Sequence, residues 1–320
     1  MKKILILGGT QFIGRNLVER LQENSEYDVT LFNRQQTNSD LFPKLKKIKG
    51  DRETNDIAQL KGQHWDGVID LSCYYPNSLQ NLLDTLKGNV KRYIFISTIS
   101  VYQKETPNLI TEDDELYSCD PLQRTDTTMA SYGSRKAECE RVLQKTEWLD
   151  KIILRPSIVY GKYDTTDRFY YWLYKAAKKQ SIILPNKGTD IITLTYVNDL
   201  VEIIIKAMDV PKHSTVYNAT THSPLSLHSI INSIDETSVI QNVNSDELLK
   251  KGIEPGLDIP LWFNRSLLIS NERLAKDLGV RMTPFDKSVK ETQAWYQSLK
   301  WPKPTTGLEE QREKLLMAER

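Results

Sequence analysis

The pair of residues best suited to acid–base chemistry is a tyrosine and a lysine four positions apart, Tyr132 and Lys136. Side chains at positions i and i+4 of a helix lie on one face, so the two can contact each other. A phenol ordinarily has a pKa of about 10, and a neighbouring ammonium group favours the phenolate. Such a pair could exchange a proton with a hydroxyl or carbonyl group. The same spacing recurs at three further places, Tyr171/Lys175, Tyr174/Lys178 and Tyr296/Lys300. Only Tyr132 lies in a helix between two core strands, so we interpret the other pairs as structural.

A glycine-rich turn follows the first apolar segment, Ile4–Leu7. It reads Gly8-Gly9-Thr10-Gln11-Phe12-Ile13-Gly14 and opens a segment with helical spacing. Glycines allow a tight turn and the approach of a pyrophosphate, whose charge suits a helix N-terminus. The alternative is an ordinary glycine turn between a strand and a helix. We predict a dinucleotide site that includes Gly8, Thr10, Gln11, Phe12, Ile13 and Gly14.

The residues that follow the next strands bear on which dinucleotide binds. The second strand ends in Asn33-Arg34, where proteins that prefer NAD usually carry an acidic residue for the ribose 2′-hydroxyl. Asn33 has no charge to repel a 2′-phosphate, and Arg34 could pair with one, so NADP is slightly favoured over NAD. Asp51 follows the third strand and could reach the adenine, or it could simply start a turn. The other residues expected at the cofactor are Arg52, Leu71, Ser72, Cys73, Lys136 and Pro156.

Short β-branched segments alternate with helical patterns through the first half of the chain. Strands are expected over 4–7, 29–32, 45–49, 68–71, 93–96 and 152–154, and helices over 12–21, 57–61, 79–86 and 130–144. Continuous apolar strands that alternate with helices indicate a parallel sheet covered on both faces. The predicted fold class is therefore α/β, a doubly wound parallel sheet of the Rossmann type.

The second half of the chain is less regular. Strands at 194–197 and 216–217 are expected to return to the same sheet, and Asn198 or Asp199 to cap a helix over 200–208. Further helices are expected over 168–179, 226–234, 271–278 and 285–299. The predicted dinucleotide-binding domain spans 1–156 together with about 191–218. A smaller C-terminal α/β lobe, over 157–190 and 219–320, is expected to bind the substrate.

An ordered set of motifs resembles the NAD-dependent epimerase/dehydratase family, the extended short-chain dehydrogenase/reductases. The glycine turn and the Tyr132/Lys136 pair are joined by three segments, Ser97-Thr98-x-Ser100-Val101-Tyr102, Leu154-Arg155-Pro156-x-x-Val159-Tyr160-Gly161 and Tyr196-Val197-Asn198-Asp199-Leu200. The resemblance implies that Tyr132 is the acid–base residue and that Lys136 holds the nicotinamide ribose. It also implies that Thr98 hydrogen-bonds the substrate oxygen.

The chain departs from this family at three places. Gln11 replaces the middle glycine, which makes the chain similar to a divergent G-G-T-x-F-[IL]-G subgroup that includes chloroplast stem-loop RNA-binding proteins. Ile99-Ser100 stands where sugar dehydratases carry an Asp-Glu pair, so a 4,6-dehydratase is disfavoured. The segment 104–128 is longer than expected and carries the acidic run Glu112–Glu115. That run could form a lid, but we interpret it as a solvated loop.

Two functions follow as hypotheses. The first is an NAD(P)-dependent epimerase or reductase that acts on a sugar, a nucleotide sugar or a similar small molecule through Thr98, Tyr132 and Lys136. The second is a non-catalytic protein of the same fold that senses NAD(P) or binds RNA. The pocket for the substrate lies in the more variable lobe, so the sequence does not name the substrate.

The composition bears on binding to nucleic acid or membranes, on disulfides and on metal sites. Lys and Arg total 43 against 42 Asp and Glu, and this balance offers no general attraction to nucleic acid or to an anionic membrane. Three cysteines and four histidines at unrelated spacings predict neither disulfides nor a metal site. The apolar run Ile4–Leu7 is too short for a signal peptide or a membrane span, so we expect a cytoplasmic protein. The resemblance also suggests a homodimer through helices near 76–87 and 130–146.

Overall fold

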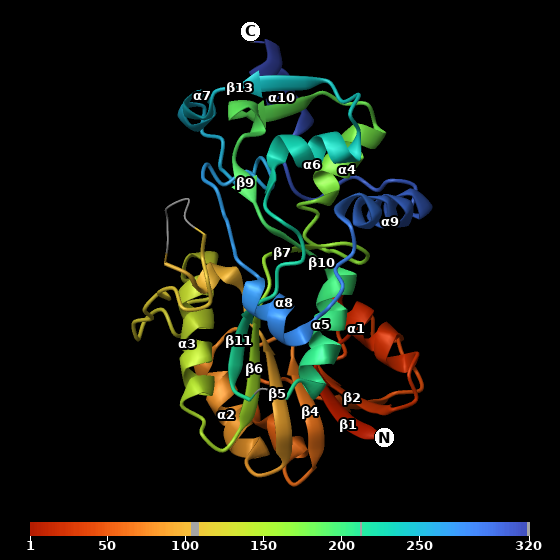
Figure 1. Ribbon diagram of the computed structural model, residues 1–320, viewed down its shortest axis with the longest axis vertical. Coiled ribbons are helices and arrows are strands. Elements are labelled where there is room, and N and C mark those ends of the chain that lie inside the picture. The colour runs from red at the N-terminus through yellow and green to blue at the C-terminus, as the bar shows by residue number, and fades with distance from the viewer. Residues whose placement is uncertain (104–108, 212, 319–320) are drawn as a thin grey trace.

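The computed structural model describes residues 1–103, 109–211 and 213–318 (Figure 1). Seven parallel strands form its main sheet in the order β11-β6-β5-β4-β1-β2-β3. Their bounds are β1 (Lys2–Leu7), β2 (Tyr27–Asn33), β3 (Lys46–Lys49), β4 (Trp65–Asp70), β5 (Val90–Ile96), β6 (Asp150–Arg155) and β11 (Thr215–Asn218). This order confirms the predicted doubly wound Rossmann sheet.

Helices cover both faces of the sheet. Helices α1 (Phe12–Gln22) and α5 (Val197–Asp209) lie on one face, and α2 (Pro76–Leu86) and α3 (Tyr132–Gln144) lie on the other (Figure 1). In β1, Ile4 and Ile6 pack with the core that includes α1, whereas Leu5 and Leu7 pack with the core that includes α2. Both faces of the strand are therefore buried over Ile4–Leu7, which is why this part is continuously apolar rather than alternating.

One predicted strand does not join the main sheet. β10 (Leu194–Tyr196) pairs in parallel with β7 (Ile158–Tyr160) in a separate two-stranded sheet. The expectation that 194–197 would return to the main sheet is therefore wrong, whereas β11 does return and pairs with β6. Because β11 occupies the position beside β6, β10 is held elsewhere by buried threonine contacts. The Thr195 hydroxyl accepts from the Ser157 amide at 3.0 Å and donates to the Ala219 carbonyl at 2.9 Å.

Two helix starts also differ from the prediction. Helix α5 begins at Val197 after Tyr196, and no side chain caps it. Asp199 lies in the first turn instead, and its carboxylate accepts from the Thr283 amide at 3.0 Å and hydroxyl at 2.6 Å. The segment predicted as a helix over 57–61 is a 3-10 helix, η1 (Asn55–Leu60), capped by the Thr54 hydroxyl.

The remaining elements lie mostly beyond the carboxyl ends of the main strands, in the upper part of Figure 1, although the helix Glu272–Leu278 packs beside β11. They are α4 (Tyr170–Ala177), α6 (Leu227–Ile234), α7 (Ser245–Lys250), α8 (Glu272–Leu278), α9 (Phe285–Ser298) and α10 (Glu310–Ala318), with the strand pairs β8 (Ile182–Pro185) and β13 (Ile240–Val243), and β9 (Ile191–Ile192) and β12 (Leu225–Ser226). Three short 3-10 helices complete the fold, η2 (Ile99–Val101), η3 (Met129–Ser131) and η4 (Asn186–Gly188).

The acidic insertion is anchored at several points of its described part, residues 109–128, although much of its surface is exposed; residues 104–108 lie outside the described chain. Glu112 is buried and accepts from the Asn218 amide at 2.8 Å. Arg124 pairs with Glu138 of α3, and Arg141 of the same helix donates to the Tyr117 carbonyl. The interpretation of Glu112–Glu115 as a solvated loop is therefore wrong for Glu112, because a buried carboxylate needs partners and finds them here.

Candidate active site

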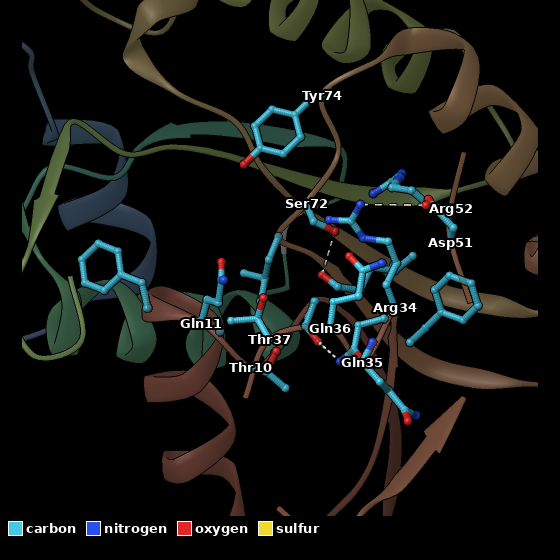
Figure 2. Close-up of a pocket in the computed structure, with 18 of the residues that line it drawn as sticks. Thr10, Gln11, Arg34, Gln35, Gln36, Thr37, Asp51, Arg52, Ser72 and Tyr74 are labelled. Atoms are coloured by element: carbon cyan, nitrogen blue, oxygen red, sulfur yellow. Dashed lines mark hydrogen bonds and ion pairs between the residues drawn. The ribbon is translucent and has the colours of Figure 1, made fainter. Parts of the chain in front are cut away.

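A cavity of about 580 Å³ lies beside the carboxyl ends of β1, β2, β3 and β4 (Figure 2). Most residues predicted to bind a cofactor line it. They are Gly8, Thr10, Gln11, Phe12, Ile13, Gly14, Asn33, Arg34, Asp51, Arg52, Leu71 and Ser72. This edge of a doubly wound sheet is where such folds bind ligands.

The glycine turn brings the start of α1 close to the cavity. Gly8 and Gly9 have φ values of 110° and 96°, which favour glycine. A Cβ on Gly14 would lie 2.8 Å from the Gly9 backbone, so only glycine allows this approach of helix to turn. Gln11 precedes α1 without capping it through its side chain. The first-turn amide groups are therefore available to an anion such as a pyrophosphate.

The segment after β2 folds over the glycine turn. The Asn33 side-chain amide donates to the Gly8 carbonyl at 2.8 Å, and Asn38 donates to the Thr10 carbonyl at 2.9 Å. Arg34 is exposed at the cavity, and its Nη1 lies 4.0 Å from a carboxylate oxygen of Asp51. Asn33 is thus held as a structural bridge, while Arg34 keeps a largely solvated guanidinium (Figure 2).

A buried charge pair supports the strand ends under the cavity. Arg52 donates to Asp70 at 2.6 Å, and the Tyr93 hydroxyl donates to the other carboxylate oxygen at 2.5 Å. Burial alone would raise the pKa of Asp70, but the charge and hydrogen bond of Arg52 hold it below its ordinary value. Asp70 in turn accepts from the Ser72 amide at 3.2 Å, which fixes the loop that lines the cavity.

Lys136 is buried on α3 and points back toward the sheet. Its ammonium group donates to the Cys73 carbonyl at 2.9 Å and to the Ile96 carbonyl at 2.7 Å. It also lies 3.9 Å from the centre of the Phe95 ring. These contacts join the loops that follow β4 and β5 to the helix that carries Tyr132.

Tyr132 is the first residue of α3 and is partly buried. Burial raises its pKa, while a hydrogen bond with Thr98 and the charges of Arg168 and Arg135 act in the opposite direction. Thr98 lies just before η2 and accepts from the Ser100 amide at 3.1 Å. The structure thus brings Thr98 and Tyr132 together, with Lys136 one helical turn away.

A glycine makes this approach of α3 to η2 possible. A Cβ on Gly133 would lie 2.2 Å from the Ser100 carbonyl oxygen, which is a severe clash with backbone. Gly133 therefore sets how closely Tyr132 can approach Thr98. The sequence contains this residue between the motif positions, but nothing in its spacing indicates the contact.

Three predicted cofactor residues do not line the cavity, namely Cys73, Lys136 and Pro156. The Cys73 side chain is turned into the apolar core with α2 and α3, and only its carbonyl serves Lys136. The Pro156 carbonyl accepts from the Ile99 amide at 3.0 Å and so supports the Thr98 segment from behind.

The cavity and the surroundings of Tyr132 include residues that the motifs do not indicate. Tyr74 has its ring centre 6.2 Å from that of Tyr132. Burial raises the pKa of Asp164 to about 6 and lowers that of Arg168. The sequence offers one signal for the residues after β2 and β7, namely the polar character of these two segments. The further lining residues are Leu7, Gly9, Phe32, Gln35, Gln36, Thr37, Gly50, Glu53, Tyr74, Tyr75, Thr165 and Thr166.

Two searches across the described residues were negative. No group of three or more His, Cys, Asp or Glu side chains is placed to hold a metal ion in that part of the chain. Within the same residues, every helix is too short or too polar to cross a membrane.

Known proteins resemble this chain over most of its length. The chloroplast stem-loop binding protein of 41 kDa b of Arabidopsis thaliana is 29% identical over 230 residues, which are 67% of this chain and 57% of that protein. The UDP-glucose 4-epimerase of Vibrio cholerae is 26% identical over 243 residues, 66% of this chain and 68% of the enzyme. The chain thus spans little more than half the length of the chloroplast protein.

The fold matches solved structures as well. A UDP-glucuronic acid 4-epimerase from Bacillus cereus, solved in complex with NAD, superposes with a TM-score of 0.72 at 19% identity and covers 94% of this chain and 100% of its own. Residues 4–220 match the NAD dependent epimerase/dehydratase family. This match covers more than half of the chain and includes the glycine turn, Thr98, Tyr132 and Lys136. The protein therefore belongs to the NAD dependent epimerase/dehydratase family.

Proposed function

We propose that this protein is an NAD(P)-dependent epimerase or reductase that acts on a hydroxyl or carbonyl group of a sugar or nucleotide sugar. The observation that carries the proposal is the meeting of Thr98 and Tyr132, one helical turn from the buried Lys136 and near a cavity suited to a dinucleotide. Relatives that are UDP-glucose 4-epimerases support the sugar substrate and the epimerase interpretation.

The residues present fit a dinucleotide. Gly14 lets α1 start in close contact with the Gly8-Gly9 turn, and α1 offers uncapped amide groups to a pyrophosphate. Bound there, the nicotinamide supplies the site that accepts or gives hydride. Arg34 and Asp51 stand at the end of the cavity where β2 and β3 finish, which suits the adenosine half.

The acid–base steps are assigned to the chain's own residues. Tyr132 takes the proton of the substrate hydroxyl when the carbon is oxidised and returns it when the carbonyl is reduced. Thr98 hydrogen-bonds the same oxygen and keeps it within reach of the phenol. Lys136 favours the phenolate through its charge and is positioned by the Cys73 and Ile96 carbonyls. Ile99-Ser100 offers no acidic pair, so we do not propose 4,6-dehydration.

We further propose that 157–190 and 219–320 form the substrate lobe. Thr165 and Thr166 already line the cavity from this part of the chain, and Arg168 interacts with Tyr132. These contacts support a substrate that binds between the edge of the main sheet and the elements in the upper part of Figure 1.

Turnover by a tyrosine variant tests the proposal. UDP-glucose, UDP-galactose and UDP-glucuronic acid are incubated with the purified protein and NAD or NADPH, and products are followed by NMR and by cofactor absorbance. We expect Tyr132→Phe to lower turnover by about 100-fold or more. Tyr27→Phe is the matched control. Tyr27 is the first residue of β2, at the end of the sheet away from the cavity, so this variant should retain wild-type turnover. Equal turnover by Tyr132→Phe would contradict the proposed role.

The preference between cofactors depends on Arg34. We propose that its exposed guanidinium pairs with a 2′-phosphate, because Asn33 brings no negative charge and is held by Gly8. Calorimetry with NAD and NADP should show tighter NADP binding that Arg34→Ala abolishes, with NAD binding little changed. Tighter NAD binding by the wild type would contradict this preference and favour a redox-neutral epimerase.

RNA binding is the second candidate, and its support is the similarity to the chloroplast stem-loop binding protein. A gel shift with a structured stem-loop RNA at rising salt tests it. Binding that weakens steeply with salt would support this candidate. Absence of binding at low salt would remove it.

A further inference from the structure

Arg135 is a buried cation that the proposed mechanism does not use. It lies on α3 three positions after Tyr132, so the two side chains are neighbours on one helical face. Its side chain is almost completely buried, at 3% exposure, and neither Nε nor Nη1 has a hydrogen-bond partner among the described residues. An unpaired buried charge is costly, so its retention calls for a physical reason.

The surroundings of Arg135 do not neutralise it. Its guanidinium lies 5.2 Å from the centre of the Tyr75 ring, and Tyr75 lines the cavity. Asp126 feels its charge, but that carboxylate is exposed and already accepts from the Ser131 and Thr128 hydroxyls. Across the described chain, no carboxylate lies within ion-pair distance of Arg135.

A second guanidinium approaches Tyr132 from the segment between β7 and α4. Arg168 donates through Nε to the Thr166 hydroxyl at 3.2 Å, beside the part of that segment that lines the cavity. Its charge interacts with those of Asp164 and Tyr132. Arg135, on the same helix as Tyr132, and Arg168, on the segment after β7, therefore bring positive charge to the surroundings of Tyr132 from two different elements.

The other groups around Tyr132 include one ammonium group, a hydroxyl, a second phenol and a thiol. Lys136 lies one helical turn from Tyr132, but two backbone carbonyls already accept from its ammonium group. From the remaining elements, Tyr74 lies after β4 and Thr98 just before η2, while the Cys139 thiol, whose pKa its hydrogen bond with Cys73 and its burial raise, lies on α3 itself. Besides the hydrogen bond with Thr98, the charges of Arg168 and Arg135 compensate for burial of the phenol.

We propose that Arg135 and Arg168 are positioning residues for Tyr132: two incompletely paired guanidinium groups that favour negative charge on its oxygen in addition to Lys136. This inference rests on the proposed function for its meaning in catalysis. The interaction itself requires no substrate, because the charges of both arginines act on Tyr132 in the protein alone.

The experiment measures the ionisation of residue 132 directly. 3,5-Difluorotyrosine, a phenol that titrates well below tyrosine, replaces Tyr132 in the full chain, and its ¹⁹F NMR shift is followed against pH. Arg135→Gln and Arg168→Gln are compared with Arg135→Lys, which keeps the charge. Arg141→Gln is the matched control, because Arg141 lies farther along the same helix and pairs with Glu138.

We expect Arg135→Gln and Arg168→Gln each to raise the titration midpoint by about one pH unit, because each removes a positive charge that favours the phenolate. Arg135→Lys should restore most of the shift, and Arg141→Gln should cause none. Midpoints in both glutamine variants equal to that of Arg141→Gln would overturn the inference. If Arg135→Gln does not fold, the partly exposed Arg168 decides alone. Failure of Tyr132→Phe to affect turnover would instead contradict the proposed function and leave this titration valid.

Discussion

At the scale of single residues, Lys136 carries two separable roles. Its ammonium group ties α3 to the Cys73 and Ile96 carbonyls, and its charge lies one helical turn from Tyr132. Lys151 is a natural comparison, since its ammonium is also held by two backbone carbonyls, those of Gln144 and Thr146, but at the far end of the sheet. A comparison of variants at Lys136 and Lys151 therefore separates an effect on stability from an effect on catalysis.

We expect Lys136→Met to lower turnover by about 100-fold or more, because the phenolate of Tyr132 loses the ammonium group one helical turn away. Lys151→Met should lower the melting temperature yet keep turnover per folded molecule near wild type. Steady-state kinetics together with thermal unfolding checks both. Equal losses of turnover in the two variants would show that Lys136 serves structure alone.

Asp164 gives the stability of the protein a dependence on pH. Burial raises its folded-state pKa to about 6, above the value near 4 expected when unfolded. The carboxyl group is protonated in both states at low pH, and its cost to the folded state grows as pH rises through about 4 to 6. At pH 7 the cost is on the order of 2–3 kcal/mol.

Asp164→Asn should therefore stabilise the protein at pH 7 and have little effect near pH 3.5. The asparagine oxygen can still accept from the Thr166 amide and hydroxyl, which both lie 2.8 Å from one carboxylate oxygen. Urea unfolding at the two pH values measures the difference. A variant that is less stable than wild type at pH 7 would contradict the assignment.

At the scale of elements, α3 is fixed to the sheet by a fully buried ion pair. Arg155 at the end of β6 donates to Glu140 of α3 through Nε at 3.0 Å and through Nη2 at 2.5 Å. Ser97, at the end of β5, donates its hydroxyl to the same carboxylate. The contact holds the helix that presents Tyr132 against the strand that leads to Thr98.

Arg155→Met should destabilise the fold by about 3–5 kcal/mol, because it leaves Glu140 charged, buried and unpaired. Arg124→Met breaks the ion pair with Glu138 on the outer face of α3, where Arg124 is partly exposed, and should cost under about 1 kcal/mol. Chemical denaturation of the two variants tests the contrast. Similar losses would mean that the Arg155 pair is not the main anchor of α3.

The elements that periodicity predicts well are those with one strong local signal. β1, β4 and β5 each contain a run of buried apolar residues because both faces of the sheet are covered, so the sequence alone reveals them. A short apolar segment does not specify its partner, which is why β10 belongs to a different sheet from the predicted one. The predicted start of α5 is wrong because Asp199 binds Thr283, far along the chain, rather than its own helix.

In the candidate site too, residues with a local sequence signal are predictable and residues placed by tertiary contacts are not. The glycine turn and the Tyr132/Lys136 pair have fixed local spacings, so the order of residues along the chain is enough to recognise them. Arg135, Tyr75 and Arg168 acquire their roles only from tertiary contacts that no spacing encodes. Cys73 is predicted at the cofactor, yet its side chain lies in the apolar core, since the direction of a loop side chain is set by packing.

At the scale of the whole molecule, the segment 109–128 alters the surface available for self-association. It packs on the outer face of α3 through Arg124 and Tyr117, and the exposed side chains of α2 are polar. A homodimer through 76–87 and 130–146 would have to displace this segment or bury those polar groups.

We therefore expect no dimer through that face. Light scattering after size exclusion should give the monomer mass of 37.0 kDa, or a dimer that Arg124→Glu does not disrupt. A dimer that this substitution dissociates would show that the outer face of α3 is the interface after all.

The central claim is that one site joins the cavity at the sheet edge to Thr98 and Tyr132. A crystal structure of the protein with bound NAD or NADP tests it most directly. We predict the pyrophosphate at the start of α1 and the nicotinamide ring within reach of the Tyr132 hydroxyl. A cofactor bound elsewhere, or a nicotinamide ring directed away from Tyr132, would contradict the account.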